Sequence, residues 1–149
     1  MKILYTGSEG FIGKNIAALL KKAVPACQVI GLDKLRTTSL DYDYLYQKSI
    51  AEFVQSSDEV FDCIIHGAAL APLPDNQINL ARSIDNNITD TARLIDYAIS
   101  TGTSKFIFLS TSAVYENSTS DLSETALLSP TLQYSQSKYL SEQFLSSVA

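Results

Sequence analysis

Two side chains near the end of the sequence have types and a spacing suited to proton transfer. Tyr134 and Lys138 would lie on the same face of a helix, because residues i and i+4 are neighbours there. A free phenol has a pKa of about 10 and is a poor base at neutral pH, whereas a nearby cation favours the phenolate and lowers that pKa. The ammonium could also donate hydrogen bonds to nucleotide ribose hydroxyls. The alternative is a surface pair, since this spacing often occurs by chance.

A second candidate site lies at the start of the sequence, where an apolar run breaks into Gly7, Gly10 and Gly13. A helical pattern follows, and its apolar face is expected to carry Ile12, Ile16, Leu19 and Leu20. Unpaired N–H groups at a helix N-terminus suit a pyrophosphate, and glycines let the backbone approach the ligand. A Gly-x-x-Gly-x-x-Gly spacing between a strand and a helix therefore indicates dinucleotide binding rather than an ordinary turn.

An acidic residue is placed to select the cofactor. Gln28–Asp33 predicts a second strand, and Asp33 ends it. A carboxylate there can accept both hydrogen bonds of the adenosine ribose diol and repels a 2′-phosphate, so NAD is favoured over NADP. The nearby Arg36 leaves some room for the phosphorylated cofactor.

These side chains must be positioned by alternating strands and helices. Beyond the first two strands, we expect a short third strand after a variable, tyrosine-rich connector (residues 36–46), rather than a stacking platform of tyrosines. The remaining apolar patterns predict strands over Val60–His66 and Lys105–Ser110, and helices around Ile50–Val54, over 78–100 and from Thr131. Gly102 fits a helix C-terminal cap. Strands alternating with helices predict an α/β fold with a parallel sheet and helices on both faces.

Composition narrows the class of protein. The 149 residues suffice for one domain with a real core, and the net charge of −5, without a basic stripe, argues against nucleic acid as a partner. No apolar run has membrane-spanning length, and the first strand begins too early for a signal peptide, so we expect a cytoplasmic protein. Cys27 and Cys63 are expected to be inert core thiols, and His66, the only histidine, makes a metal site improbable.

Several motifs in order make the whole chain resemble the extended short-chain dehydrogenase/reductase family, in particular the NAD-dependent nucleotide-sugar epimerases and dehydratases. Thr6 to Gly13 matches the family's glycine turn, and Asp33 matches its ribose acid. His66–Ala69 is similar to the His-x-Ala-Ala element, and Ser110–Tyr115 is similar to Ser-Ser-x-x-Val-Tyr. The resemblance implies a Rossmann-type doubly wound sheet of about five strands in the order 3-2-1-4-5.

The resemblance also implies roles for individual residues. The catalytic trio would be Thr111, Tyr134 and Lys138. Asn87 falls where the family has a cofactor-contacting asparagine, with Asn86 as the adjacent alternative. The implied cofactor-binding residues are Gly7, Gly10, Phe11, Ile12, Gly13, Asp33, Ser49, Ile50, His66, Ala68, Ala69, Asn87, Tyr134 and Lys138.

The chain departs from the family pattern at several places. Ser49 and Ile50 stand where the family usually has an aspartate near adenine, and Glu116 replaces the usual glycine. The 4,6-dehydratases have Asp-Glu after the catalytic threonine, where this chain has Ser112-Ala113; this difference argues for epimerisation or carbonyl reduction. Family members are also considerably longer, so residues 1–149 are expected to be the NAD(P)-binding domain alone.

The resulting hypothesis is the NAD-binding domain of a nucleotide-sugar epimerase-like enzyme, inactive by itself. Tyr134 would take the proton of a sugar hydroxyl, Lys138 would lower its pKa and hold the ribose, and Thr111 would hydrogen-bond the reacting oxygen. Alternatives are a non-catalytic NAD-binding module, a 4-keto reductase or a dehydratase. The helix over 78–100 and the terminal helix would form half of a homodimer interface. The sugar itself is not readable from these residues.

Overall fold

The computed structural model describes residues 1–35, 41–71, 79–118 and 121–149. The chain forms two compact units. The sheet unit consists of Met1–Ala69 and Arg93–Leu109, and the terminal unit of Leu70–Ala92 and Ser110–Ala149. The predicted contribution of Arg36 falls outside the described residues.

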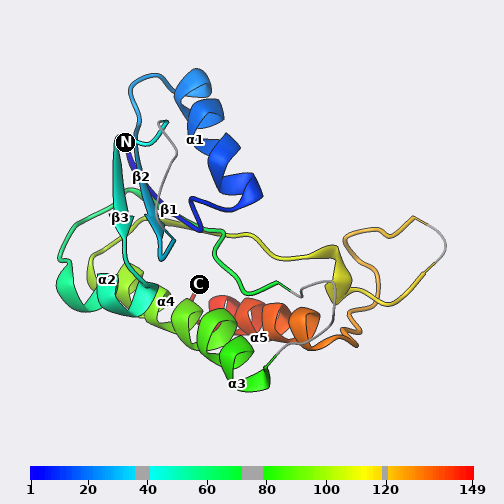
Figure 1. The fold of residues 1–149 in the computed structure, drawn as a ribbon. Helices are drawn as coiled ribbons and strands as arrows, with labels where there is room; N and C mark the ends of the chain where they lie inside the picture. Colours follow the sequence, from blue (N-terminus) through cyan, green and yellow to red (C-terminus); the bar gives the residue numbers. More distant parts are fainter. Residues whose placement is uncertain (36–40, 72–78, 119–120) are drawn as a thin grey trace. The chain divides into compact units, whose positions relative to one another are not determined.

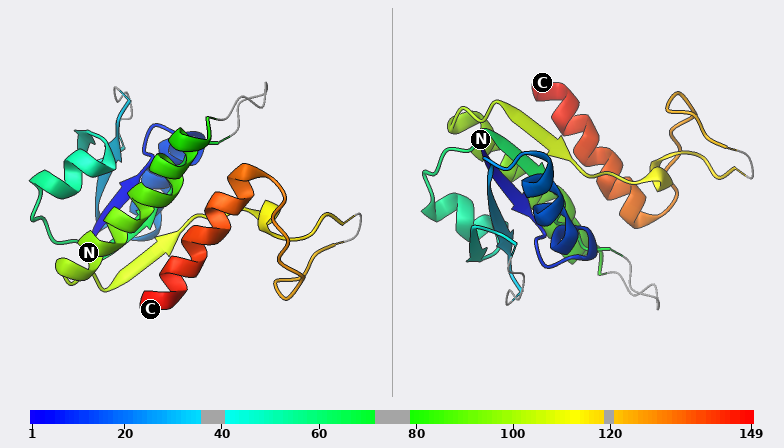
Figure 2. Two further views of the ribbon diagram at one scale, coloured as in Figure 1. Left: turned by 90° about the horizontal axis from the view of Figure 1, so that it is seen from below. Right: turned by 90° about the horizontal axis from the view of Figure 1, so that it is seen from above.

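The sheet unit is built on five parallel strands in the order β3-β2-β1-β4-β5 (Figures 1 and 2). The predicted doubly wound order is therefore confirmed. Thr6, at the end of β1, is aligned with Leu32 of β2 and with His66 of β4, so the carboxyl ends of the central strands meet at one edge. The elements of this unit are β1 (Lys2–Thr6), α1 (Phe11–Ala23), β2 (Gln28–Asp33), β3 (Tyr44–Gln47), α2 (Ile50–Ser56), β4 (Cys63–His66), α4 (Asp90–Ser100) from Arg93 onward, and β5 (Lys105–Phe108).

Helices cover both faces of the sheet, as the alternation of elements predicted. Successive residues of β1 point to opposite faces, so Leu4 joins one core and Tyr5 the other. The first core also contains Phe53 of α2 and Leu94 of α4, whereas the second contains Ala17 of α1. Figure 1 shows α1 on one side of the strands and α2 and α4 on the other.

The buried face of α1 matches the predicted one only in part, because Ile16 and Leu20 pack against the core as expected but the other two apolar residues do not. Ile12 and Leu19 are more than half exposed, and the fully buried positions are Gly13 and Ala17. Small residues on the inward face let the helix approach the sheet closely. Apolar periodicity alone could not predict that small residues face the sheet, because large apolar side chains dominate the pattern.

The tyrosine-rich connector has a definite structural role. Tyr42 is buried, and its hydroxyl donates a 2.6 Å hydrogen bond to the carbonyl of Gly13. Asp43 accepts from the backbone N–H of Val29 at 2.7 Å and pairs with Lys21 at 2.9 Å. The segment before β3 therefore ties α1 to β2, which the interpretation as a variable connector missed.

The predicted helix over 78–100 consists of three pieces in the described residues. The α-helix α3 (Leu80–Ser83) is followed by a π-helical segment, η1 (Ile84–Thr89), and then by α4. Gly102 ends this run with φ at +71°, and Thr103 N–H donates to Ala98 O at 2.9 Å, so the predicted glycine cap is confirmed. Ile78 lies outside the described residues.

The terminal unit contains α3, η1, a 3₁₀ turn η2 (Ser112–Val114) and the long helix α5 (Gln133–Val148). Helix α5 contacts α3, η1 and η2. Its first residue is Gln133 rather than the predicted Thr131. Between η2 and α5, an antiparallel bridge joins Tyr115 and Leu128.

Two strand boundaries also differ from the predicted ones. β4 begins at Cys63 rather than Val60, which is 59% exposed, and β5 ends at Phe108 rather than Ser110. Cys27 and Cys63 are free and buried, and burial raises the pKa of the Cys63 thiol, as expected of an inert core thiol. Over the described ranges, no helix combines the length and the apolar character required to cross a bilayer.

Candidate functional site

The glycine turn between β1 and α1 has a geometry that only glycine allows. Gly7 has a φ of +81°, and a Cβ built there would lie 2.8 Å from the backbone nitrogen of Ala68. A Cβ at Gly13 would lie 2.3 Å from Gly7 O. The turn is held by the N–H of Gly10, which donates to Gly7 O at 3.0 Å. Helix α1 therefore starts directly above the strand end, with Gly10 as an N-cap that has no side chain to occupy the first-turn N–H groups.

Two apolar side chains border this turn at the surface. Phe11 is 90% exposed and Ile12 is 54% exposed, although both belong to the first turn of α1. Their proposed contact with a cofactor stays a prediction, and their exposure is compatible with it.

Asp33 lies beside the glycine turn at the end of β2. Its Oδ2 accepts from the backbone N–H of Glu9 at 2.9 Å, and its Oδ1 accepts from the N–H of Leu35 at 3.0 Å. Each carboxylate oxygen keeps a further acceptor position, so the group can still receive the two hydroxyls of a ribose diol. The backbone amides therefore orient the carboxylate without using up its capacity.

The end of β4 approaches the turn closely. His66 is fully buried, and its Nδ1 lies 2.6 Å from the hydroxyl of Thr6. The same hydroxyl accepts from the N–H of Ala68 at 3.2 Å. His66 thus locks the ends of β1 and β4 together, and Ala68 and Ala69 leave the strand end free of large side chains.

Ser49 and Ile50 are fully accounted for by local structure. Ser49 is the N-cap of α2, and it forms a capping box with Glu52, whose Oε2 accepts from Ser49 N–H at 2.8 Å. Ile50 is buried in the core beneath α2. Their contact with adenine stays a prediction.

Asn87 occupies the middle of the π-helical segment η1 and is 1% exposed. Its Oδ1 accepts from Leu70 N–H at 2.6 Å, and its Nδ2 donates to Leu70 O at 3.1 Å and to Ser137 Oγ at 3.0 Å. The Asn87 carbonyl accepts from Thr91 Oγ1 and from Ser141 Oγ. Both amide hydrogens are therefore used within the terminal unit. The alternative residue, Asn86, donates its amide to Arg82 O along the helix.

The three residues of the predicted catalytic trio all lie in the terminal unit. Thr111 caps the turn η2, where its Oγ1 accepts from Ala113 N–H at 3.2 Å. Tyr134 and Lys138 follow one another by one turn of α5, and η2 contacts that helix. Ser137 Oγ donates to Tyr134 O at 2.7 Å, which couples the first turn of α5 to Asn87.

Burial shapes the electrostatics of Tyr134 and Lys138. Lys138 is only 1% exposed, and this burial lowers its pKa to about 8, against the opposing effect of Glu142. Burial raises the pKa of the Tyr134 phenol. The expected lowering of the phenol pKa is therefore not what this structure shows, because burial disfavours the charged phenolate.

The structure contains residues important for the site that the sequence argument did not single out. Glu9 and Tyr42 support the glycine turn, whereas Ser137 and Ser141 hold α5 against Asn87. The only signal for the serines is their i, i+4 spacing on α5, and that pattern points to a polar helix face rather than to a buried one.

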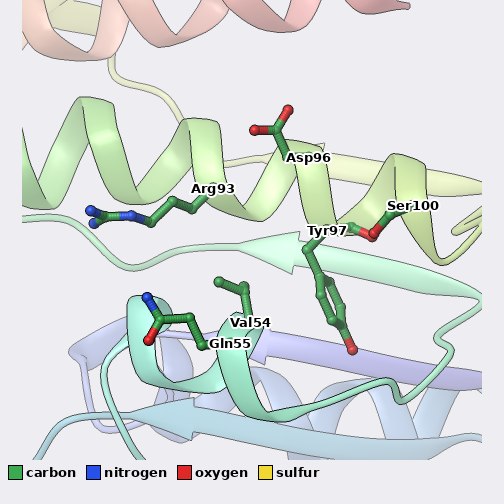
Figure 3. A pocket seen from close by; sticks show the side chains of 6 residues that line it. All are labelled: Val54, Gln55, Arg93, Asp96, Tyr97 and Ser100. Carbon is green, nitrogen blue, oxygen red and sulfur yellow. The ribbon is translucent and has the colours of Figure 1, made fainter.

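An open depression on the sheet unit lies apart from these residues. It has a volume of about 360 Å³ and lies between α2 and α4 (Figure 3). Figure 3 shows the side chain of Asp96 pointing away from α2, whereas the ring of Tyr97 extends from α4 toward the side of the depression where α2 lies. None of the candidate site residues lines it, and in the described ranges no group of three or more His, Cys, Asp or Glu side chains could hold a metal ion.

Comparison with known proteins identifies the family of this chain. The profile of the NAD dependent epimerase/dehydratase family matches residues 3–149. The chain belongs to this family. Among the curated relatives of this family member, the dTDP-D-glucose 4,6-dehydratase of Dictyostelium discoideum is 31% identical over 173 residues, covering 98% of the chain and 40% of the relative.

Solved structures from the family agree in fold. The UDP-Glc/GlcNAc 4-epimerase of Campylobacter jejuni is 29% identical with a TM-score of 0.83, and the match covers 98% of this chain and 48% of that one. The UDP-glucuronic acid 4-epimerase of Bacillus cereus, solved in complex with NAD, is 25% identical with a TM-score of 0.83, covering 99% and 52%. This family member thus spans about half the length of these structures and less of the curated relative.

Proposed function

We propose that this chain is the NAD-binding part of a nucleotide-sugar epimerase-like enzyme, which transfers hydride between a sugar carbon and NAD. The observation that carries this proposal is the pairing of two features in one chain: a glycine turn that a Cβ would fill, and a Tyr–Lys pair on a helix whose lysine is buried. The family is NAD-dependent, and the proposal extends this property to the site residues of this chain.

The residues at the edge of the sheet unit fit a dinucleotide. A pyrophosphate would be held by backbone N–H groups at the start of α1, where the glycines leave room for close approach. The adenosine ribose diol would donate to Asp33, which two backbone amides already orient. Bound NAD would supply the hydride acceptor and donor for the sugar carbon.

The residues of the terminal unit would handle the proton. Tyr134, as phenolate, would accept the proton of a sugar hydroxyl and later return it, while Thr111 would hydrogen-bond the reacting oxygen. With a pKa of about 8, Lys138 is still about nine-tenths protonated at pH 7, so its positive charge would work against the burial that raises the pKa of Tyr134. Asn87 and Ser137 would keep this turn of α5 in place.

Two observations bear on the reaction type. Ser112 and Ala113 stand where the 4,6-dehydratases carry Asp-Glu, and a threonine hydroxyl with no adjacent acid suits epimerisation or carbonyl reduction better than loss of water. Because the D. discoideum dehydratase is among the relatives, dehydration is kept as an alternative reaction.

The sugar-nucleotide pocket is proposed to come from the portion of such enzymes that this chain does not match. The chain covers only 40% of the dehydratase and 48% of the C. jejuni epimerase. By itself the chain would then bind NAD without turning over a sugar. A non-catalytic NAD-binding module is the second candidate function, favoured by the same partial coverage.

The test is cofactor binding by calorimetric titration with NAD and NADP. NAD is expected to bind more tightly, because Asp33 would face the 2′-phosphate with like charge. Replacing the carboxylate by Asp33→Ala should weaken NAD binding by roughly 1.5–3 kcal/mol for each charge-assisted hydrogen bond lost. Equal or tighter binding of NADP by the unmodified chain would overturn the role given to Asp33.

A further inference from the structure

A second carboxylate lies within the glycine turn and has no role in the function proposed above. Glu9 stands between Ser8 and Gly10, and its side chain is only 4% exposed. Its Oε2 lies 3.8 Å from Nζ of Lys14, whose side chain is 51% exposed. A buried acid in a turn that would receive an anionic pyrophosphate calls for an explanation, since its charge opposes that ligand.

Glu9 is directly coupled to the acid that would read the ribose. Its backbone N–H donates to Asp33 Oδ2 at 2.9 Å, so the two acidic residues share the edge between the turn and the end of β2. A ligand that hydrogen-bonds Asp33 therefore lies next to the backbone of Glu9 as well.

The charges of both residues converge on one nearby group. The Tyr42 hydroxyl donates to Gly13 O in the first turn of α1, and its pKa is raised, first by burial and then by negative charge that includes Glu9 and Asp33. The Glu9 carboxylate is thus close enough to add to the field of Asp33, and its burial keeps that field less screened than at the surface.

We propose that Glu9 is a second residue that determines cofactor specificity, acting with Asp33 to exclude a 2′-phosphate. The inference rests on the NAD site of the proposed function. NAD and NADP carry the same pyrophosphate, so repulsion of that group by Glu9 cancels when the two affinities are compared. Only NADP brings additional negative charge to the ribose. The charge of Glu9 therefore weakens NADP binding more than NAD binding, and so raises the ratio Kd(NADP)/Kd(NAD).

The experiment measures the ratio Kd(NADP)/Kd(NAD) by titration of the 149-residue chain and its variants. Glu9→Gln keeps the shape of the side chain and removes its charge, and it should lower the ratio by about fivefold at low ionic strength. The effect should shrink in 0.5 M salt, because the Debye length then falls to about 4 Å and the charge of Glu9 is screened over a shorter distance. Asp33→Asn should lower the ratio too, and Glu9→Gln combined with Asp33→Asn should lower it further.

Two further variants separate charge from structure. Lys14→Gln removes the cation that partly offsets Glu9 and should raise the ratio; because Lys14 is half exposed, this variant tests the idea even if Glu9→Gln does not fold. Asp58→Asn removes an exposed charge that precedes β4, at the opposite edge of the sheet, and should leave the ratio unchanged.

The outcomes distinguish this inference from the proposed function. Should Glu9→Gln weaken both cofactors equally, or Lys14→Gln leave the ratio as it was, Glu9 merely supports the turn and the inference is overturned while the NAD site stands. Absence of binding of either cofactor to the unmodified chain would overturn the proposed function and this inference together.

Discussion

Lys138 is the residue whose chemistry depends most on where the fold places it. An ammonium group loses hydration when it is buried, so the neutral form gains and the pKa falls, here to about 8. In the unfolded chain a lysine has a pKa of about 10.4, so between these two values the unfolded state binds more protons than the folded one. The contribution of Lys138 to the free energy of unfolding is therefore lowest below pH 8, and it rises as the pH increases from about 8 to about 10.4.

Lys138→Met is accordingly expected to stabilise the fold at pH 7. Removing a buried charge should raise the free energy of unfolding by roughly 1–3 kcal/mol, and the gain should shrink as the pH rises from 7 to 9.5. Urea unfolding of both proteins across this range measures it. Titration of Tyr46, whose pKa is raised to about 12, affects both proteins alike and cancels in the difference.

Lys22→Met provides the matched control for this prediction. Lys22 is exposed in the last turn of α1, so its replacement should change the free energy of unfolding little. A gain from Lys138→Met that did not depend on pH would show that packing, not charge, accounts for it.

At the scale of elements, the joint between β1 and α1 decides whether a dinucleotide can approach. The helix begins where three glycines allow the backbone to turn back over the strand, and α1 packs on the sheet through its smallest residues, Gly13 and Ala17. This close packing stabilises the joint, and it also places the N–H groups of the first turn of α1 at the edge of the sheet.

Gly13→Ala should damage this joint. The added Cβ would lie 2.3 Å from Gly7 O and 2.7 Å from Ser8 O, and both are backbone atoms that can yield only if the turn shifts. We expect a loss of about 1–3 kcal/mol in unfolding free energy, with weaker NAD binding. Gly10→Ala is the control, because its Cβ would meet a single atom, Gly7 O, at 3.2 Å. A Gly13→Ala protein as stable as the Gly10→Ala protein would contradict this account of the turn.

The helices of the terminal unit illustrate how one element positions another. The π-helical segment η1 brings Asn87 inward, and there its amide spans from Leu70 to Ser137 on α5. A π turn places one extra residue in the helix, and such turns recur at functional sites. Here it supplies a buried polar contact to the helix that carries Tyr134 and Lys138.

At the scale of the whole molecule, the helices of the terminal unit expose several large apolar side chains. α3 and η1 contact α5, as predicted for the helix pair. Between 42% and 58% of each of the following side chains is exposed: Leu80, Ile84, Leu140, Phe144 and Val148. On α5 the exposed residues recur every four positions and so form one stripe.

We expect this stripe to be covered in a homodimer. Analytical ultracentrifugation at micromolar concentrations should show a dimer, and Phe144→Glu should shift it to monomer by placing a charge within the apolar stripe. Leu122→Glu, which changes a comparably exposed leucine in the loop before α5, should leave the dimer intact. A monomer at every concentration of the unmodified chain would refute the expectation.

Catalysis is also a property of the whole molecule. Holding reactants in a near-attack geometry contributes up to about 7–11 kcal/mol of barrier reduction, and the proposed trio cannot provide this positioning without a pocket for the sugar nucleotide. We expect the 149-residue chain to bind NAD but not to turn over UDP-, GDP- or dTDP-sugars.

Supplying the unmatched portion of a full-length relative as a fusion should restore turnover, and Tyr134→Phe should abolish it again. Turnover by the short chain alone would show that it builds its own sugar site. The loop from Glu116 to Ser129 would then be the first place to look, whereas most of the other loop considered, from Leu70 to Gln77, lies outside the described residues.

Local patterns in the sequence were sufficient for the framework of this protein. An apolar run, a glycine turn and a helical repeat predicted β1 and α1, and Asp33 was recognised at the end of β2 because strands and turns are encoded by near neighbours in the chain. Continuous apolar runs predicted buried strands, and the family resemblance supplied the strand order.

Only the tertiary structure decided how the site residues are held. Asn87 and Ser137 are 50 positions apart in the sequence, and Tyr42 and Gly13 are 29 positions apart. A local repeat therefore could not predict the hydrogen bonds within these two pairs. The same is true of Lys138, which has the sequence context of a surface lysine and a pKa of about 8 in the fold. Burial and long-range hydrogen bonds arise when distant segments exclude water together, and periodicity along the chain carries no record of which segments will meet.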